Sequence, residues 1–200
     1  VEFSDLPGFA RMERRTVTVP AGGTAVLEET CVPVPVDIEW GSYLSGRWAS
    51  AVEVDGAGNL YVAGAFSGGW RDEVDVFLDA YVMKLSPAGG LIWSTHFGGP
   101  GGESCLGVAV DGLGNVYAVG GAGSCDWVSG GWDTVCDGAC DYLVKLSPDG
   151  GLLWSTYLEN VEVCKVAADA AGNAYVAGTV DSADWISGGW DITPNGEWDG

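Results

Sequence analysis

The chain has 200 residues, of which 47% are hydrophobic and 18% charged, with eight Lys and Arg residues against 28 Asp and Glu residues. The formal net charge of −20 repels phosphate groups, so it excludes nucleic acid as a partner and disfavours anionic membrane surfaces. No apolar run reaches the roughly 20 residues that a transmembrane helix needs, and 33 glycines without a 3.6-residue apolar period predict short strands and tight turns.

The first 32 residues have the pattern of a β-hairpin. Valines alternate with threonines at the start of the 15–27 segment, which is typical of a half-buried hairpin. This segment resembles the C-terminal strands of a bacterial immunoglobulin-like module. Pro33 and Pro35 follow it, so we expect residues 33–37 to form a stiff, extended linker.

Two sequence phrases recur in the remaining residues, 38–200. The first, DGAGNLYVAG, begins at residue 55 and returns as DGLGNVYAVG at residue 111 and as DAAGNAYVAG at residue 169, so the copies start 56 and 58 residues apart. The second, YVMKLSPAGGLIWST, begins at residue 81 and returns as YLVKLSPDGGLLWST at residue 142. A fixed period of this length indicates a repeat architecture.

Each of the first two repeats contains four predicted strands joined in part by tight turns, and the third contains two predicted strands and a loop. In the second repeat these strands cover residues 106–110, 116–120, 141–146 and 152–158, and Gly and Asn in the turns at 111–115 and 147–151 favour positive φ angles. Four antiparallel strands in one period are typical of a β-propeller blade. The predicted blades lie near residues 45–97, 104–158 and 161–200, after a fourth strand at 38–44.

The predicted fold is therefore all-β, a partial β-propeller preceded by the hairpin. The blades amount to about two and three-quarters, whereas a closed ring needs at least about four. Either the chain is a fragment of a longer protein, or other copies complete its open blades.

The two recurring phrases resemble the bacterial β-propeller repeats known as SBBP repeats. In that family, a D-[AG]-x-G-N-x-Y-V-x-G phrase precedes a K-L-S-P-x-G-x-L-x-W-S-T phrase, and the resemblance covers residues 38–200. It implies a secreted or surface-exposed bacterial protein with a propeller scaffold. It implies no particular reaction.

Three long loops, 65–79, 121–140 and 179–199, are predicted on one face of the sheets, opposite the tight turns. Loops of this length in compact domains are often functional. Two of them share the motif DWxSGGWD, at 126–133 and 184–191. The loop tryptophans either pack against the sheets or bind a carbohydrate or protein through their flat rings. The candidate ligand-binding residues are Trp70, Trp127, Trp132, Trp185 and Trp190.

The same loops carry carboxylates that are candidates for a calcium site, because calcium takes six to eight oxygen ligands. The candidates are Asp126, Asp133, Asp184 and Asp191. No DxDxDG loop is present, and a solvated acidic surface is the alternative explanation. We expect no other cofactor.

The six cysteines contain no Cys-x-x-Cys pair, which disfavours a zinc site and favours an extracellular protein with disulfides. Sequence alone leaves about 15 connectivities. We favour a bridge within the 125–140 loop, where the candidates are Cys125, Cys136 and Cys140. Cys105 and Cys164 hold similar positions in two repeats and are expected to be buried thiols or bridge partners.

No catalytic set is recognisable in the sequence. His96, the only histidine, stands where Tyr43 and Tyr157 stand in the neighbouring repeats, which indicates an aromatic packing position. The turn residues Asp55, Asp111 and Asp169 sit where a tight turn requires them.

These patterns favour a non-catalytic extracellular or cell-surface scaffold or binding protein, adhesive or self-assembling into a filament. Its expected partners are other copies of the chain or a cell-surface polymer such as a carbohydrate. The alternatives are a carbohydrate-binding propeller and a propeller enzyme of the quinoprotein type.

Overall fold

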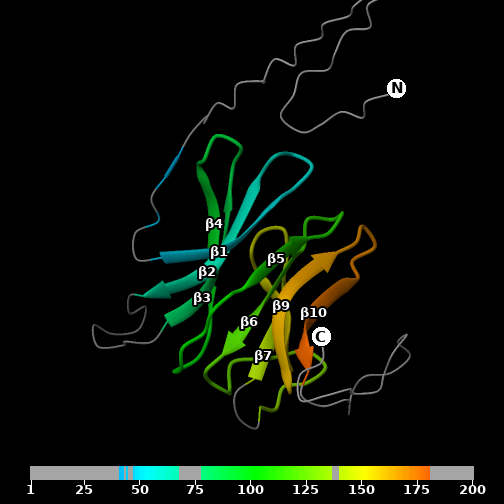
Figure 1. The fold of residues 1–200 in the computed structure, drawn as a ribbon. Helices are drawn as coiled ribbons and strands as arrows, with labels where there is room; N and C mark the ends of the chain where they lie inside the picture. Colours follow the sequence, from blue (N-terminus) through cyan, green and yellow to red (C-terminus); the bar gives the residue numbers. More distant parts are fainter. Residues whose placement is uncertain (1–40, 43, 45–46, 68–77, 137–139, 181–200) are drawn as a thin grey trace, which may run out of the picture. The chain divides into compact units, whose positions relative to one another are not determined.

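The computed structural model describes residues 41–42, 44, 47–67, 78–136 and 140–180, and every regular element in these ranges is a β-strand (Figure 1). The predicted hairpin (1–32) and linker (33–37) lie outside the described residues. Within the described ranges, no helix is long and apolar enough to cross a membrane. The all-β prediction is confirmed for this part of the chain.

The described strands form three antiparallel sheets. The first sheet has the order β1 (Arg47–Val54), β2 (Leu60–Ser67), β3 (Leu78–Leu85), β4 (Leu91–Phe97). The second sheet has the order β5 (Gly107–Val110), β6 (Val116–Ala122), β7 (Cys140–Leu146), β8 (Leu152–Leu158). The third sheet pairs β9 (Val161–Ala168) with β10 (Ala174–Val180).

The predicted strands of the second repeat are confirmed, and each four-stranded sheet follows chain order. Strands β2, β6 and β10 run slightly further than predicted, to Ser67, Ala122 and Val180. The described residues of the predicted strand at 38–44, namely 41, 42 and 44, are not in a strand. The strands within the described ranges do not close into a ring.

The recurring Asp-x-x-Gly-Asn phrase forms the same turn three times. In the first turn, Asp55 Oδ1 accepts hydrogen bonds from the N–H groups of Ala57 and Asn59, each at 2.9 Å, and Asp55 Oδ2 accepts one from Asn59 Nδ2 at 2.8 Å. Asp111 and Asp169 make the equivalent bonds. These aspartates therefore have the structural role in the turn that the sequence predicted.

The last glycine of each phrase is required by a close approach of the backbone. A Cβ at Gly120 would lie 1.8 Å from the carbonyl oxygen of Ser104, and one at Gly64 would lie 1.8 Å from the carbonyl oxygen of Trp48. Both contacts are far inside van der Waals distance. Any side chain here would separate β2 or β6 from the segment paired with it, so the phrase ends in glycine.

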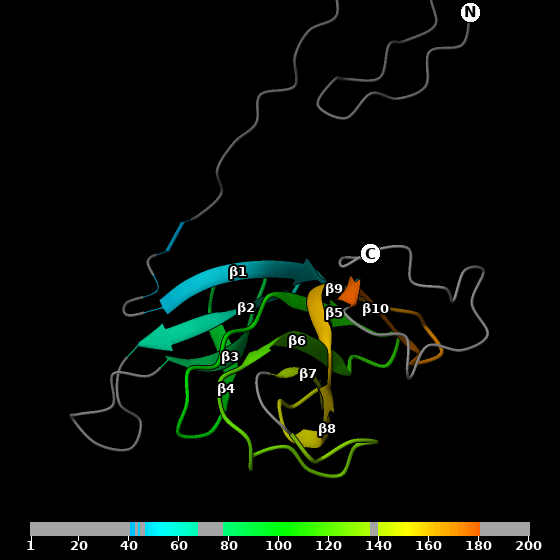
Figure 2. The same cartoon turned by 60° about the horizontal axis from the view of Figure 1, so that its bottom comes forward.

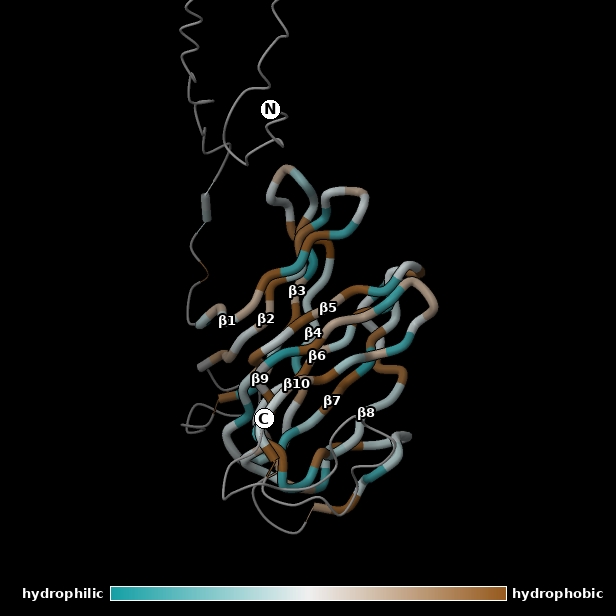
Figure 3. Tube along the Cα trace, turned by 45° about the vertical axis from the view of Figure 1, so that its right-hand side comes forward, coloured by the Kyte–Doolittle hydropathy of each residue, from teal (hydrophilic) through white to brown (hydrophobic). Residues whose placement is uncertain are grey.

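The sheets pack face to face through apolar side chains. Tyr61 and Val82 of the first sheet share a buried cluster with Val108, Val144 and other residues of the second. A second cluster joins β6 and β7 to β9 and includes the buried Val163. Strand β9 thus lies beside β5 and β6 (Figure 2), and hydrophobic stretches run along the strands of the first two sheets (Figure 3).

Hydrogen bonds between sheets reinforce this packing. Trp93 Nε1 on β4 donates to the carbonyl oxygen of Pro148 at 2.9 Å, and Thr95 Oγ1 donates to that of Gly150 at 2.6 Å. Between the second and third sheets, Tyr117 OH donates to the carbonyl oxygen of Gly172 at 2.7 Å. In each case a side chain of one sheet binds a turn of the next.

Candidate functional site

The loop between β6 and β7 lies along the outer edge of β8. Ser129 accepts a hydrogen bond from the Ser155 N–H at 2.8 Å and donates its own N–H to Ser155 Oγ at 2.9 Å. Further along, the Asp133 N–H donates to Thr156 Oγ1 at 2.8 Å, and the Tyr157 N–H donates to the Asp133 carbonyl oxygen at 2.9 Å. The loop therefore covers an edge that would otherwise expose unpaired backbone groups.

The two glycines of the SGGW motif make this path possible. Gly130 has a φ of 75°, which residues other than glycine rarely adopt, and it forms a parallel β-bridge with Ser155. A Cβ at Gly131 would lie 2.2 Å from the Ser155 carbonyl oxygen. The motif is thus explained by the contact of the loop with β8.

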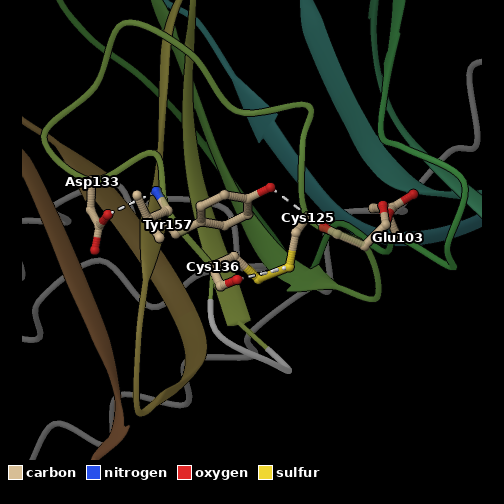
Figure 4. The surroundings of a disulfide bond; sticks show 7 residues. Glu103, Cys125, Asp133, Cys136 and Tyr157 are labelled. Atoms are coloured by element: carbon tan, nitrogen blue, oxygen red, sulfur yellow. Dashed lines mark hydrogen bonds between the residues drawn. A yellow bond between two sulfur atoms is a disulfide. The ribbon is translucent and has the colours of Figure 1, made fainter.

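A disulfide between Cys125 and Cys136 closes the same loop (Figure 4). This confirms the prediction of a bridge within residues 125–140. The third candidate, Cys140, is buried at the start of β7 and is not part of this bridge. Because the bridge restricts the unfolded chain, it stabilises the folded loop.

The two described tryptophans of the loop have different environments. Trp127 is partly buried and packs against the rings of Phe97, Tyr142 and Tyr157, with centroid distances of 6.0, 5.1 and 6.2 Å. Phe97 belongs to the first sheet and the two tyrosines to the second, so Trp127 joins both. In contrast, Trp132 is 78% exposed. The packing explanation suits Trp127, and the ligand-binding one suits Trp132.

The calcium candidates of the loop are not gathered into a recognisable site. Asp133 Oδ1 accepts a hydrogen bond from the Val135 N–H at 3.0 Å, and Asp126 lies in the left-handed region with a φ of 91°. Among residues 47–67, 78–136 and 140–180, no group of three or more His, Cys, Asp or Glu side chains is placed to hold a metal ion. Asp184 and Asp191 lie outside the described residues, as do Trp70, Trp185 and Trp190.

Glu103, which the sequence analysis missed, is a fully buried carboxyl group in the connection from β4 to β5. It accepts hydrogen bonds from the Ser124 hydroxyl, next to the disulfide, and from the Gly99 N–H. Burial raises the pKa of Glu103 above its usual value, and the nearby Asp79 carboxylate adds to the rise, although the two hydrogen bonds oppose it. The only signal in the sequence was an acidic residue at the end of a glycine-rich segment.

The recurring charges of the two phrases pair with each other. Lys84 Nζ lies 3.9 Å from Asp55 Oδ2 and 4.9 Å from the centre of the Tyr61 ring. Lys145 repeats this arrangement with Asp111, at 4.0 Å, and with Tyr117. The lysines are thus part of the sheet structure.

Two further residues behave as packing groups. Burial raises the pKa of the Cys105 thiol to about 12, as expected for a protonated core thiol and not for a nucleophile. Burial also lowers the pKa of His96, whose ring contacts Phe66 and Tyr81 at 5.4 and 6.4 Å. The aromatic surroundings fit the expected packing position.

The described part of the loop, up to residue 136, is closed by the disulfide and presents the exposed indole of Trp132. No protein-family model matches the sequence, and no curated protein matches it.

Proposed function

We propose that this protein is a non-catalytic scaffold of a secreted or cell-surface kind, whose sheets are blades of a propeller and whose β6–β7 loop binds a cell-surface carbohydrate. The observation that carries the proposal is Trp132, which is 78% exposed on a backbone fixed by the hydrogen bonds of Asp133 and by the disulfide. An indole held in this way loses little entropy on binding. Its flat, apolar face suits a sugar ring.

The extracellular location rests on the disulfide and on the acidic composition. Disulfides persist in oxidising compartments and are rare in the cytosol. A net charge of −20 keeps the protein away from anionic polymers, so a neutral polysaccharide is the expected ligand.

Binding to neutral polysaccharides, immobilised on an array, tests the proposal. Wild-type protein should bind, Trp132→Ala should lose at least about tenfold in affinity, and Val135→Ala should bind like the wild type. Val135 is a matched control because it lies in the same loop and is 63% exposed. Binding that survives Trp132→Ala, or no binding to any glycan, would contradict the proposal.

The contacts of three described basic residues favour the scaffold over the quinoprotein alternative. Such a cofactor carries carboxylates that need free cations, whereas Lys84 and Lys145 are paired with aspartates, and the Arg47 guanidinium lies over the Phe66 ring at 4.8 Å. The absorption spectrum of the purified protein distinguishes the two functions, since a bound quinone would add a band outside the protein range.

A further inference from the structure

On the rear face of the first sheet, which points away from the second sheet, the valines of β1 are exposed, whereas Met83 and Leu85 of β3 on the same face are buried. Val52 and Val54 of β1 alternate with the partly buried Ala51, which packs against the second sheet. Val52 is 61% exposed and Val54 is 55% exposed. Val108 corresponds to Val52 in the second repeat, because each lies three residues before the turn aspartate. Val108 is only 6% exposed because the first sheet covers it.

The front face of the third sheet, which points away from the second, is exposed in the same way. Tyr175 is 58% exposed, whereas its counterparts Tyr61 and Tyr117 are 0% and 1% exposed under the following sheet. Ala177 is also exposed, whereas its counterpart Ala63 is fully buried.

The covered junctions show what fits these faces. The front of the first sheet, with Tyr61 and Ala63, covers the rear of the second sheet, with Val108. The exposed front of the third sheet carries Tyr175 and Ala177 at the equivalent positions. The exposed rear of the first sheet carries Val52 at the position of Val108. Each open face is therefore complementary to the other, by continuity with a junction already formed inside the chain.

The hydrogen bonds extend this match. Tyr117 OH donates to the turn carbonyl of Gly172 in the next sheet, whereas Tyr175 OH donates to Asp169 of its own turn, at 3.0 Å. Gly58 holds the place of Gly172 in the first turn, with a similar φ of 81° against 87°. The Gly58 carbonyl of another molecule could thus accept from Tyr175.

We propose that two copies of this chain dock head to tail, with the β9–β10 front face of one copy covering the β1–β4 rear face of the next. Such an interface joins two different surfaces, so it can propagate into a filament or close into a ring. The proposal deepens the scaffold function above and rests on it. Since every copy carries a net charge of −20, salt should strengthen the association.

Sedimentation velocity over a range of concentrations and salt tests the docking. We expect wild-type protein to associate. A rear variant, Val52→Asp with Val54→Asp, and a front variant, Ala177→Asp, should each associate at least about tenfold more weakly alone. Val135→Asp, at a position as exposed as Val52, should associate like the wild type.

A mixture of the two variants gives the sharpest result. Each variant keeps one intact face, so the mixture should form a dimer and nothing larger. Circular dichroism and thermal melting check that all variants fold. Wild-type protein that stays monomeric, or a mixture that forms no dimer, would overturn the docking. Glycan binding measured on the same samples separates this failure from failure of the proposed function, because Trp132 lies on neither face.

Discussion

The two tryptophans of the β6–β7 loop should contribute very unequally to stability, and alanine replacements measure the difference. A fully buried aromatic side chain removes about 150–250 Å² from water, which is worth about 4–6 kcal/mol at about 25 cal/mol/Å². Trp127 is mostly buried, which gives about two-thirds of this value or more, and each of its three ring contacts can add about 0.5–1.5 kcal/mol. We therefore expect Trp127→Ala to lower the free energy of unfolding by about 3–5 kcal/mol.

Trp132→Ala is the matched control, because it makes the same chemical change five positions away in the same loop. Trp132 is 78% exposed, so its loss should cost less than about 1 kcal/mol. Urea unfolding of both variants, with the disulfide intact, gives the two values. Equal losses, or a loss below about 1 kcal/mol for Trp127→Ala, would refute the conclusion that Trp127 packs between the first and second sheets.

Three further changes test the loop and the residues that support it. Glu103→Gln should remove one pH-dependent contribution to stability. Because the folded pKa of Glu103 is raised above 4.5, its contribution is fully present at low pH and is lost as pH rises through the folded pKa, with a slope of up to about 1.4 kcal/mol per pH unit. The variant should lack this part of the slope over the same pH range, and equal slopes for wild type and variant would contradict this. Gly131→Ala should destabilise by about 1–3 kcal/mol in urea unfolding, because the new Cβ meets the Ser155 carbonyl oxygen, while Gly56→Ala, which meets nothing within 4 Å and matches Ala170 of the third phrase, should change stability by less than about 0.5 kcal/mol. Replacing Cys125 and Cys136 together by serine should lower the free energy of unfolding by about 2–3 kcal/mol in the same assay. An unchanged free energy of unfolding would contradict a stabilising role of the bridge.

The strands and turns were predictable because their signals are local. Alternating apolar residues and the Asp-x-x-Gly-Asn phrase fix a hairpin within about ten residues, and the hydrogen bonds of Asp55, Asp111 and Asp169 are made inside the phrase itself. The bridge within the 125–140 loop followed from short sequence separation in the same way. These features needed no knowledge of how the sheets pack.

The environments of the loop residues could not be predicted, because they depend on contacts that are distant in sequence. Trp127 and Trp132 lie in one motif, and contacts with residues distant in sequence, on β4, β7 and β8, distinguish the indole that packs in the core from the exposed one. Glu103 was missed for a similar reason. An isolated acidic residue after glycines is typical of an exposed linker, but the Ser124 hydroxyl and the Gly99 N–H hold it in the interior.

For a residue that recurs in every phrase, the hydrogen bonds within the turn are local, whereas its burial depends on the neighbouring sheet. The turn aspartates show this in their electrostatics. Burial by itself would raise the pKa of Asp111, but hydrogen bonds from Asn115, Leu113 and Tyr117 outweigh it and the pKa falls. Asp169 has the equivalent bonds, led by that from the Asn173 side chain, and almost no burial to oppose them, so its pKa falls to about 2.

The tyrosine of each phrase extends the same reasoning to the open faces. Tyr61 and Tyr117 are covered by the sheet that follows them, and Tyr175 is the same residue at a position without such a cover among the described residues. An exposed strand position that only faced water would have no physical need for a large aromatic side chain whose counterparts are buried. Tyr175, like Val52 at the opposite face, is thus the type of residue found in an interior, and this favours a further sheet as the natural neighbour of each end.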